Sequence, residues 1–449
     1  MYKDNKITKV IKRSGIVVPF AQERILNAIY KAAIATGGRN KKTAEKLSNK
    51  VIDILNKCFS PANPPNVEDI QDITEEVLIE SGHSKTAKAF ILYRYDRIKE
   101  RLEKGKRTVV PFDKVPYHRI YHILNWAIDN NVERISKVNE IIKQDKFSQL
   151  VEISENKYQE EIETAAKMML EMEDNLKVVI VAGPSSSGKT TTTIKTSEIL
   201  KQNKKNFVTL NVDNYFYDLK LHPKDEHGDY DFETPEALDL ELINKHIHQL
   251  IAGKEVAVPS YNFKTGRREK KTSPLKLNPG EIILIDSLHG LHKKMTGSID
   301  SSNKFNLYIE TLLQMKDKNN EFIRWTDLRL LRRMVRDSKY RSYNPQMTIE
   351  HWHYVRSSEL RHIIPFVNTA DYVINSAMPY ELPVMKNLLS RNLKGFINTL
   401  KNNVTKQDAY LRATRIKQLL ESFSSIEDFS CIPSDSLIRE FIGGSRYKY

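Results

Sequence analysis

The segment GPSSSGKT, at residues 183–190, is the part of the chain with the clearest chemical potential, because it matches the pattern G-x-x-x-x-G-K-[ST] in full. In such a glycine-rich turn several backbone N–H groups point at phosphate oxygens, and the positive end of the following helix adds to the attraction. Lys189 would bind the β- and γ-phosphates of ATP, and the hydroxyl of Thr190 would bind Mg²⁺. The predicted ATP-binding residues are Gly183, Ser185, Ser186, Ser187, Gly188, Lys189, Thr190 and Thr191.

Two acidic residues follow predicted strands. Asp213 comes directly after the run Asn206–Val212 and is followed by three aromatic residues at 215–217. Asp286 comes directly after the apolar run Ile282–Ile285. Ligands of open α/β sheets bind at the carboxyl ends of the strands, where a carboxylate can accept the proton of an attacking hydroxyl. We therefore interpret Asp213 as a general base for an organic acceptor and Asp286 as an acid that holds Mg²⁺. Each could instead be a turn residue at the end of a strand.

An arginine-rich segment follows at residues 329–337. On a helix, residues three and four apart are neighbours, so Arg329, Arg332, Arg333 and Arg336 share one side. Such a face can close over phosphates as a lid and stabilise charge during transfer. The alternative is a solvated helix face, and we favour the lid.

From Lys177 onward, strand patterns alternate with segments long enough for crossover helices. This alternation predicts an α/β fold, a P-loop doubly wound parallel sheet with helices on both faces. We expect this domain at residues 176–391, followed by a C-terminal helical extension at 392–449. The predicted strands are Lys177–Ala182, Asn206–Val212, Ile282–Asp286, Lys304–Ile309 and Tyr372–Asn375.

Residues 1–105 have a different pattern and predict a small, mostly helical domain. Two β-like runs, Thr8–Lys12 and Ile16–Phe20, flank a short turn and predict an N-terminal hairpin. Helical patterns follow, with Asn66 as a predicted N-cap and Gly82 as a predicted stop. Residues 106–175 are interpreted as a helical connector, in which we identify no chemistry.

The composition indicates a folded protein of several domains without a membrane-spanning segment. With 449 residues and 40% hydrophobic residues, two or three packed domains can form. The two cysteines, Cys58 and Cys431, are far apart, the first residues are polar and basic, and no apolar run is long enough to span a bilayer. We expect a cytoplasmic protein that does not contact membranes. The net charge of +14 is spread without a dense basic run, so we favour a lysine-rich surface with an anion-binding site over nucleic-acid binding.

The order of motifs resembles the uridine kinase and phosphoribulokinase family, in its long bacterial uridine-kinase-like branch, over about residues 176–449. The matching segments are AGPSSSGKTTT at 182–192, the Asp213 motif, YDFETPEALD at 230–239, PSYNFKTGR at 259–267 and the arginine-rich segment. The resemblance implies transfer of the γ-phosphoryl of ATP to a nucleoside hydroxyl, with Asp213 as base and Lys189 and Arg332 at the transferring phosphates. It implies acceptor contacts by Phe216, Glu233, Tyr261, Phe263 and Arg329.

Two departures leave the acceptor open. Gly266 stands where uridine kinases have a histidine that binds the base, and Asp286-Ser287 replaces a Glu-Gly pair. A polar base without its hydrogen-bond partner would bind poorly. The alternatives are a uridine- or cytidine-like nucleoside, another small hydroxylated metabolite such as a sugar phosphate, or a nucleotide-sensing regulator with weak kinase activity.

The N-terminal region resembles the ATP-cone, a regulatory nucleotide-binding domain of ribonucleotide reductases and of their transcriptional repressor. The matching segments are VIKRSG at 10–15, VEDIQDI at 67–73, ESGH at 80–83 and AKAFILYR at 87–94. The resemblance implies that ATP or dATP binds at Lys12 and Arg13 and regulates the enzyme allosterically, with a change of oligomeric state.

Overall fold

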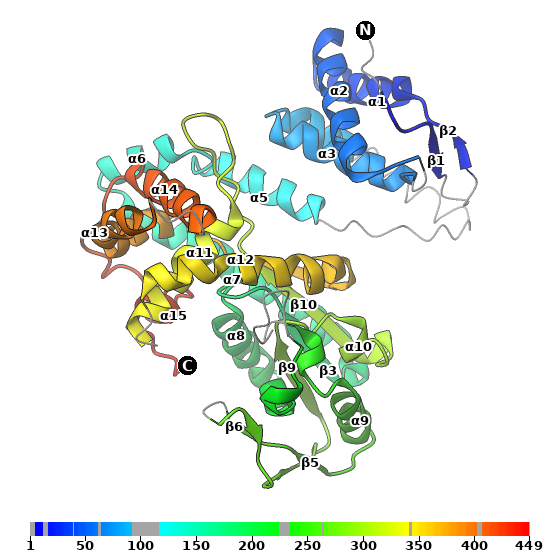
Figure 1. Cartoon of the computed structure of the whole chain (residues 1–449), viewed down its shortest axis with the longest axis vertical. Coiled ribbons are helices and arrows are strands. Elements are labelled where there is room, and N and C mark those ends of the chain that lie inside the picture. Colours follow the sequence, from blue (N-terminus) through cyan, green and yellow to red (C-terminus); the bar gives the residue numbers. More distant parts are fainter. Residues whose placement is uncertain are drawn as a thin grey trace. The chain divides into compact units, whose positions relative to one another are not determined.

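The computed structural model describes residues 5–11, 17–38, 40–61, 64–91, 116–223, 234–262, 265–340, 344–401 and 406–448, without the side chains of 391, 392 and 394 (Figure 1). The chain divides into two compact units, Met1–Trp126 and Ala127–Tyr449. Within the described residues, no helix is long and apolar enough to cross a membrane.

The first unit begins with an antiparallel hairpin of β1 (Lys9–Ile11) and β2 (Val17–Pro19), in which Val10 lies opposite Val18. This hairpin confirms the predicted one, while its turn, with Lys12 and Arg13, lies outside the described residues. Three helices follow, and their apolar faces form a common core. They are α1 (Gln22–Ala35), α2 (Lys41–Cys58) and α3 (Val67–Glu80).

Helix α3 begins where the sequence predicts. The side-chain oxygen of Asn66 accepts hydrogen bonds from the N–H groups of Glu68 and Asp69, and the Asp69 carboxylate accepts one from the Asn66 N–H at 2.8 Å. This reciprocal capping satisfies N–H groups that the helix itself leaves without partners. Gly82, with a φ of +78°, follows the last turn, and a further helix starts at residue 84 and is described to 91.

The second unit is built on a five-stranded parallel sheet with the order β11-β10-β3-β9-β4. Each of the five predicted strands is present, and the parallel pairing confirms the predicted α/β fold. The bounds are β3 (Val178–Ala182), β4 (Asn206–Thr209), β9 (Glu281–Ser287), β10 (Lys304–Glu310) and β11 (Tyr372–Asn375). Strand β4 ends earlier than predicted, and the short 3-10 helix η2 (Val212–Tyr215) follows it.

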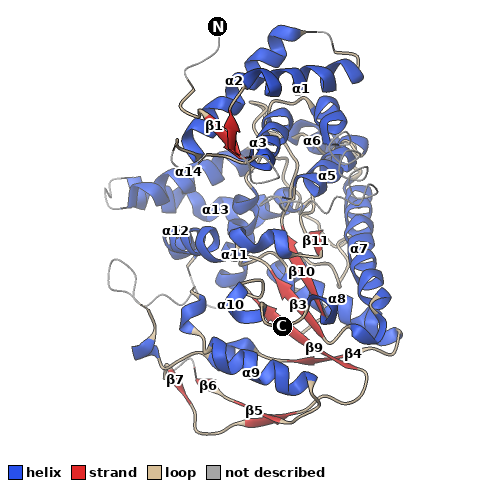
Figure 2. Cartoon of the chain, turned by 90° about the vertical axis from the view of Figure 1, so that its right-hand side faces the viewer, coloured by secondary structure: helices blue, strands red, loops and turns tan. Residues whose placement is uncertain are grey.

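Helix α7 lies along the sheet and packs on α8 and β11 (Figure 2). The Tyr158 and Thr192 hydroxyls are 2.6 Å apart, and the Tyr372 hydroxyl donates to Glu161. Part of the segment that we interpreted as a connector is therefore a component of the second unit. From that segment come α6 (Ile135–Lys143) and α7 (Phe147–Glu171), whereas α5 (Tyr117–Asp129) contains the position at which the two units divide and α8 (Lys189–Gln202) follows β3.

The remaining helices of the second unit follow the strands. Helix α13 passes through residue 391, where we placed a domain boundary, and packs on α11 and α14. The helices are α9 (Leu240–Ile251), α10 (Lys293–Thr296), α11 (Trp325–Tyr340), α12 (Pro345–His362), α13 (Glu381–Lys401), α14 (Gln407–Glu421) and α15 (Arg439–Ile442). Two small hairpin pairs, β5 (Val256–Val258) with β8 (Ser273–Leu275) and β6 (Tyr261–Asn262) with β7 (Arg267–Arg268), lie beyond α9.

Candidate functional site

The glycine-rich loop connects the fully buried strand β3 to α8, as predicted. A Cβ atom at Gly183 would lie 2.3 Å from the carbonyl oxygen of Ile309, and one at Gly188 would lie 2.3 Å from Leu437 Cδ1. Gly188 also has a φ of +89°, a left-handed conformation that favours glycine. Both glycines of the motif are therefore required by the close packing of this turn, and the loop presents its backbone at the N-terminus of α8.

Lys189 is the first residue of α8, and its ammonium group donates a hydrogen bond to the Gly183 carbonyl at 3.1 Å. Desolvation lowers the pKa of Lys189, and the neighbouring Arg336 and Arg329 lower it further. The carboxylates of Asp286 and Glu440 act in the opposite direction. The lysine thus lies in a confined site where an added anion, such as a phosphate, would strengthen its charged form.

Asp213 and Asp286 are brought to the same end of the sheet as the loop. Asp286 lies on β9 opposite Val181 of β3, and Asp213 lies in η2, where its N–H is bonded to the Asn211 side chain at 3.0 Å. Desolvation raises the pKa of both carboxyls, Lys189 counteracts the shift in both, and the charge of Asp213 adds to the shift of Asp286. The charge of Lys189 therefore acts on both acids at this end of the sheet.

These groups fit a Mg²⁺ site. Thr190 is exposed beside Lys189, and its hydroxyl and the carboxylates of Asp213 and Asp286 are hard oxygen donors. Mg²⁺ is bound in proteins by one or two carboxylates together with substrate phosphates and water. The described residues hold no group of three or more His, Cys, Asp or Glu that would form a metal site by themselves.

The lid interpretation is wrong for Arg329 and Arg332, which are only 1% and 0% exposed. Arg329 pairs with Glu310 at 2.9 Å and with Glu359, and these carboxylates raise its pKa although burial disfavours the charge. Both guanidinium groups also donate to carbonyls of the loop, Arg329 to Ser185 and Arg332 to Ser186. The two arginines therefore support the loop backbone from the protein interior instead of covering a ligand.

Two other arginines of α11 are more accessible. Arg333 donates to the hydroxyl of Ser185 at 3.2 Å, and both Arg333 and Arg336 pair with Asp337. The charge of Arg336 also affects the pKa of Lys189. The half-buried Arg333, for which sequence analysis predicted no individual role, thus contacts a side chain of the loop.

The predicted acceptor residues are brought together only in part. The rings of Phe216 and Tyr261 lie 5.5 Å apart, and His222 stacks on Phe216 at 5.5 Å. The His222 ring bonds to the Tyr217 carbonyl at 2.8 Å. Glu233 and Phe263 lie outside the described residues. The aromatic cluster therefore gains a histidine that no sequence motif indicated.

Arg268 is a second residue that sequence reasoning missed. Its guanidinium donates to the carbonyls of Tyr215 and Phe216 at 2.7 and 2.9 Å and pairs with Asp239 at 3.0 Å. These bonds fix the segment that follows Asp213. The residue lies in a run of exposed basic residues, where nothing in the sequence separates it from its neighbours.

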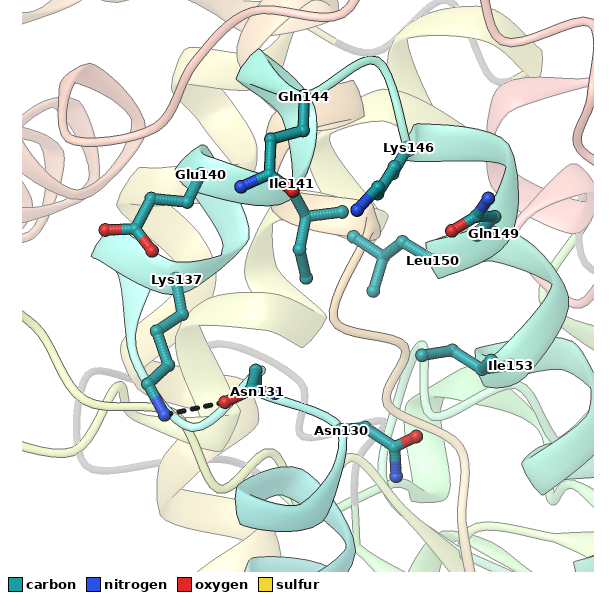
Figure 3. Close-up of a pocket in the computed structure, with 10 residues that line it drawn as sticks. All are labelled: Asn130, Asn131, Lys137, Glu140, Ile141, Gln144, Lys146, Gln149, Leu150 and Ile153. Atoms are coloured by element: carbon teal, nitrogen blue, oxygen red, sulfur yellow. Dashed lines mark hydrogen bonds between the residues drawn. The ribbon is translucent and has the colours of Figure 1, made fainter.

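A separate pocket of about 380 Å³ lies between the end of α5, α6 and the start of α7 (Figure 3). Its rim includes Lys137, whose ammonium donates to the Asn131 side chain at 3.0 Å. No residue of the loop and neither of the two acids lines this pocket. The pocket is therefore distinct from the nucleotide site.

Comparisons with known proteins identify the families that two parts of the chain match. Residues 178–382 match the model of the phosphoribulokinase / uridine kinase family, and residues 8–99 match that of the ATP cone domain. The chain contains a P-loop kinase domain of this family joined to an ATP cone. Both assignments confirm the resemblances found in the sequence.

Individual relatives match one part or the other. The kinase domain is 27% identical over 198 residues to a uridine kinase of Deinococcus deserti and 29% identical over 199 residues to one of Staphylococcus aureus strain Newman, covering 44% of this chain and 86% of each relative. A vitamin B12-dependent ribonucleoside-diphosphate reductase of Thermoplasma acidophilum is 43% identical over 103 residues, which are 22% of this chain and 13% of the reductase. A solved structure described as a possible uridine kinase from Bacillus stearothermophilus aligns with 48% of this chain and 97% of its own at 16% identity and a TM-score of 0.33, which supports no further argument.

Proposed function

We propose that this kinase transfers the γ-phosphoryl of ATP to a hydroxyl of a uridine- or cytidine-like nucleoside. The proposal rests on the arrangement of Asp286 on β9 and Asp213 in η2, at the end of the sheet that holds the glycine-rich loop, where the charge of Lys189 acts on both acids. Most of the length of the relatives named uridine kinases aligns with this domain, which supports a nucleoside as the acceptor. The charge effect of Lys189 on Asp213 supports the proposal that this carboxylate acts on an acceptor near the terminal phosphate.

In this mechanism Asp213 accepts the proton of the acceptor hydroxyl while the hydroxyl oxygen forms a bond to the γ-phosphorus. The bond from the γ-phosphorus to the bridging oxygen breaks, and ADP leaves. Lys189 stabilises the charge on the transferring group, and Arg333, which contacts Ser185 of the loop, assists it. Thr190 and Asp286 would hold Mg²⁺, which neutralises phosphate charge when bound.

The acceptor pocket combines two features that favour different ligands. The rings of Phe216, His222 and Tyr261 form a surface on which a flat base can stack. Gly266, with a φ of +65°, packs against Leu219, whose Cβ lies 3.0 Å from the position of an added side-chain carbon. A side chain at the position of the family's histidine would be crowded by Leu219 and strained by the backbone, which keeps another hydroxylated metabolite, such as a sugar phosphate, as the second candidate.

An acceptor screen tests both candidates. The purified chain is incubated with Mg²⁺, γ-labelled ATP and a panel of nucleosides and sugar phosphates, and the Lys189→Ala variant serves as the blank. Label in uridine or cytidine above the blank supports the proposal. Label confined to sugar phosphates identifies the second candidate, and no label above the blank with any acceptor contradicts kinase activity.

We further propose that the ATP cone binds ATP or dATP through Lys12 and Arg13 and regulates the kinase. The match of residues 8–99 to the cone model and the reductase relative support this second site. In the Lys189→Ala variant, calorimetry with ATP and dATP should still detect binding, and the further change Lys12→Ala/Arg13→Ala should remove it. Complete loss of binding in Lys189→Ala alone would contradict a separate site.

A further inference from the structure

Helix α8, which starts at the glycine-rich loop, has one polar face that is covered by protein. Thr191, Lys195 and Glu198 are four and three residues apart and therefore lie on the same side of the helix. Thr191 is fully buried and Lys195 is 8% exposed. Polar side chains of this kind are buried at a cost in free energy unless partners satisfy them.

The partners come from a segment more than two hundred residues away, residues 433–448, which we call the strap. The Glu440 carboxylate accepts from the Thr191 hydroxyl at 2.8 Å. Asp435 pairs with Lys195 at 3.1 Å, and the Tyr447 hydroxyl and Arg446 bond to Glu198 at 3.0 and 3.4 Å. Each of these three residues of α8 is thus paired with a residue of the strap.

The strap is fixed in place by buried contacts. Leu437, Ile438 and Phe441 have no solvent exposure, and the Ser436 hydroxyl lies 3.0 Å from that of Tyr380. Helix α15, which is part of the strap, packs on α11 (Figure 1). Lys339 of α11 donates to the Ile442 carbonyl at 2.6 Å. The central part of the strap, residues 436–443, therefore belongs to the core, while its last residues are partly or fully exposed.

Two strap residues contact the nucleotide loop and the first turn of α8. The Leu437 side chain fills the space next to Gly188, where a Cβ would clash with it. Glu440 accepts from the Thr191 N–H at 3.3 Å as well as from its hydroxyl, in the first turn of α8. The cationic groups around this carboxylate are Lys189 of α8 and Arg332 and Arg336 of α11. N–H groups at the start of such a helix are the donors that bind phosphates.

We propose that Glu440 is a positioning residue of the nucleotide site: through Thr191 it holds the first turn of α8 in the orientation that binds ATP. The proposal rests on the proposed function only in taking the loop as an ATP site. A carboxylate that instead occupied the phosphate position would compete with ATP, and its removal would tighten binding. Loss of a positioning contact weakens binding, so the two roles have opposite signs.

The test measures MgATP binding to the full chain by calorimetry. The Lys189→Ala variant shows which part of the binding belongs to the kinase site. Where an acceptor is known, KM for ATP is measured as well. Glu440→Ala should weaken binding roughly tenfold, the order expected for a buried donor pair that loses its acceptor. Glu440→Gln, whose carbonyl oxygen can accept both Thr191 bonds, should restore binding to within about threefold of the native protein. Because the readout is binding, failure of the nucleoside assignment would leave this test intact.

Two controls separate positioning from general damage. Arg446→Ala, in the exposed part of the strap, should leave ATP binding unchanged. Thr191→Val keeps the side-chain shape and removes the hydroxyl, so it should weaken binding in the same direction even where Glu440→Ala fails to fold. Native or tighter binding by Glu440→Ala or Thr191→Val would overturn the proposal, as would a loss that Glu440→Gln does not restore.

Discussion

The guanidinium of Arg332 forms a two-pronged ion pair with Glu381, with Nε–Oε2 and Nη2–Oε1 distances of 2.7 and 2.6 Å. Neither side chain has any solvent exposure. The remaining nitrogen of Arg332 donates to the Ser186 carbonyl at 3.3 Å. The phosphate loop is therefore connected to α13 through a buried pair of charges, and its conformation depends on that pair.

Removing one member of this pair should destabilise the second unit. Arg332→Met leaves the Glu381 carboxylate buried without its partner, and we expect a loss of about 3–5 kcal/mol in the free energy of unfolding. Urea unfolding measures it. Lys417→Met, which breaks a solvent-exposed pair with Glu421, should cost about 1 kcal/mol or less. Equal losses in the two variants would contradict the structural role of Arg332.

Arg333 should affect catalysis rather than stability. It is half-buried and contacts the Ser185 hydroxyl, and the buried carboxylate of Asp337 keeps its ion pair with Arg336 when Arg333 is removed. We expect Arg333→Ala to lower kcat about 10²-fold, the order seen when one group that stabilises transition-state charge is lost. Steady-state kinetics measures kcat, and thermal unfolding provides the control. An unchanged kcat would exclude Arg333 from the transition state.

Two glycines should respond in opposite directions to the same change. Gly183→Ala places a Cβ 2.3 Å from the Ile309 carbonyl oxygen, which belongs to the backbone of β10 and cannot rotate away. We expect loss of MgATP binding and a lower melting temperature. Gly395 lies in α13 with open space around it, so Gly395→Ala should stabilise the protein by about 0.5–1 kcal/mol. Calorimetry and thermal unfolding test the two, and tolerance of alanine at Gly183 would contradict the loop geometry.

His246 should make the protein less stable in acid. It is buried on α9, its Nδ1 lies 2.8 Å from the Tyr215 hydroxyl, and desolvation lowers its pKa, with Lys245 acting in the same direction. The unfolded chain, with a histidine pKa of about 6.5, then binds the proton more readily than the folded one. The contribution of His246 to the free energy of unfolding is therefore fully present above that pKa, and it is lost as the pH falls below it.

The pH dependence can be assigned by comparing two histidines of α9. His246→Gln should reduce the drop in melting temperature between pH 7.5 and 5.5, because the group that must gain a proton on unfolding is gone. His248 is exposed and bonds to Ser298, so His248→Gln should leave the drop unchanged. A drop that is the same in the native protein and His246→Gln would show that another group is responsible.

The sequence predicted the fold well because its signals are local. The five strands are apolar runs bounded by breakers, and the loop after Ala182 is a contiguous motif. Asp213 and Asp286 could be placed because the carboxyl ends of parallel strands meet at one edge. The roles given to these residues stay predictions until variants are measured.

The predictions were wrong or incomplete where contacts between distant segments determine the surroundings of a side chain. The spacing of Arg329 and Arg332 defines a helix face, and only the positions of Glu310, Glu359 and Glu381 show that this face is internal. The strap has no periodic pattern, so its contacts with α8 could not be foreseen. His222 and Arg268 were missed because only the folded chain brings their side chains to Phe216 and to the Tyr215 carbonyl.

The central claim is that Asp213 acts as the base at the phosphate loop. The most direct measurement compares native protein and Asp213→Asn in single-turnover transfer from γ-labelled ATP to the acceptor found in the screen, with MgATP binding measured in parallel. We expect unchanged ATP binding and transfer slowed about 10²-fold or more, the magnitude typical of a lost general base. Transfer at the native rate by Asp213→Asn would contradict the account.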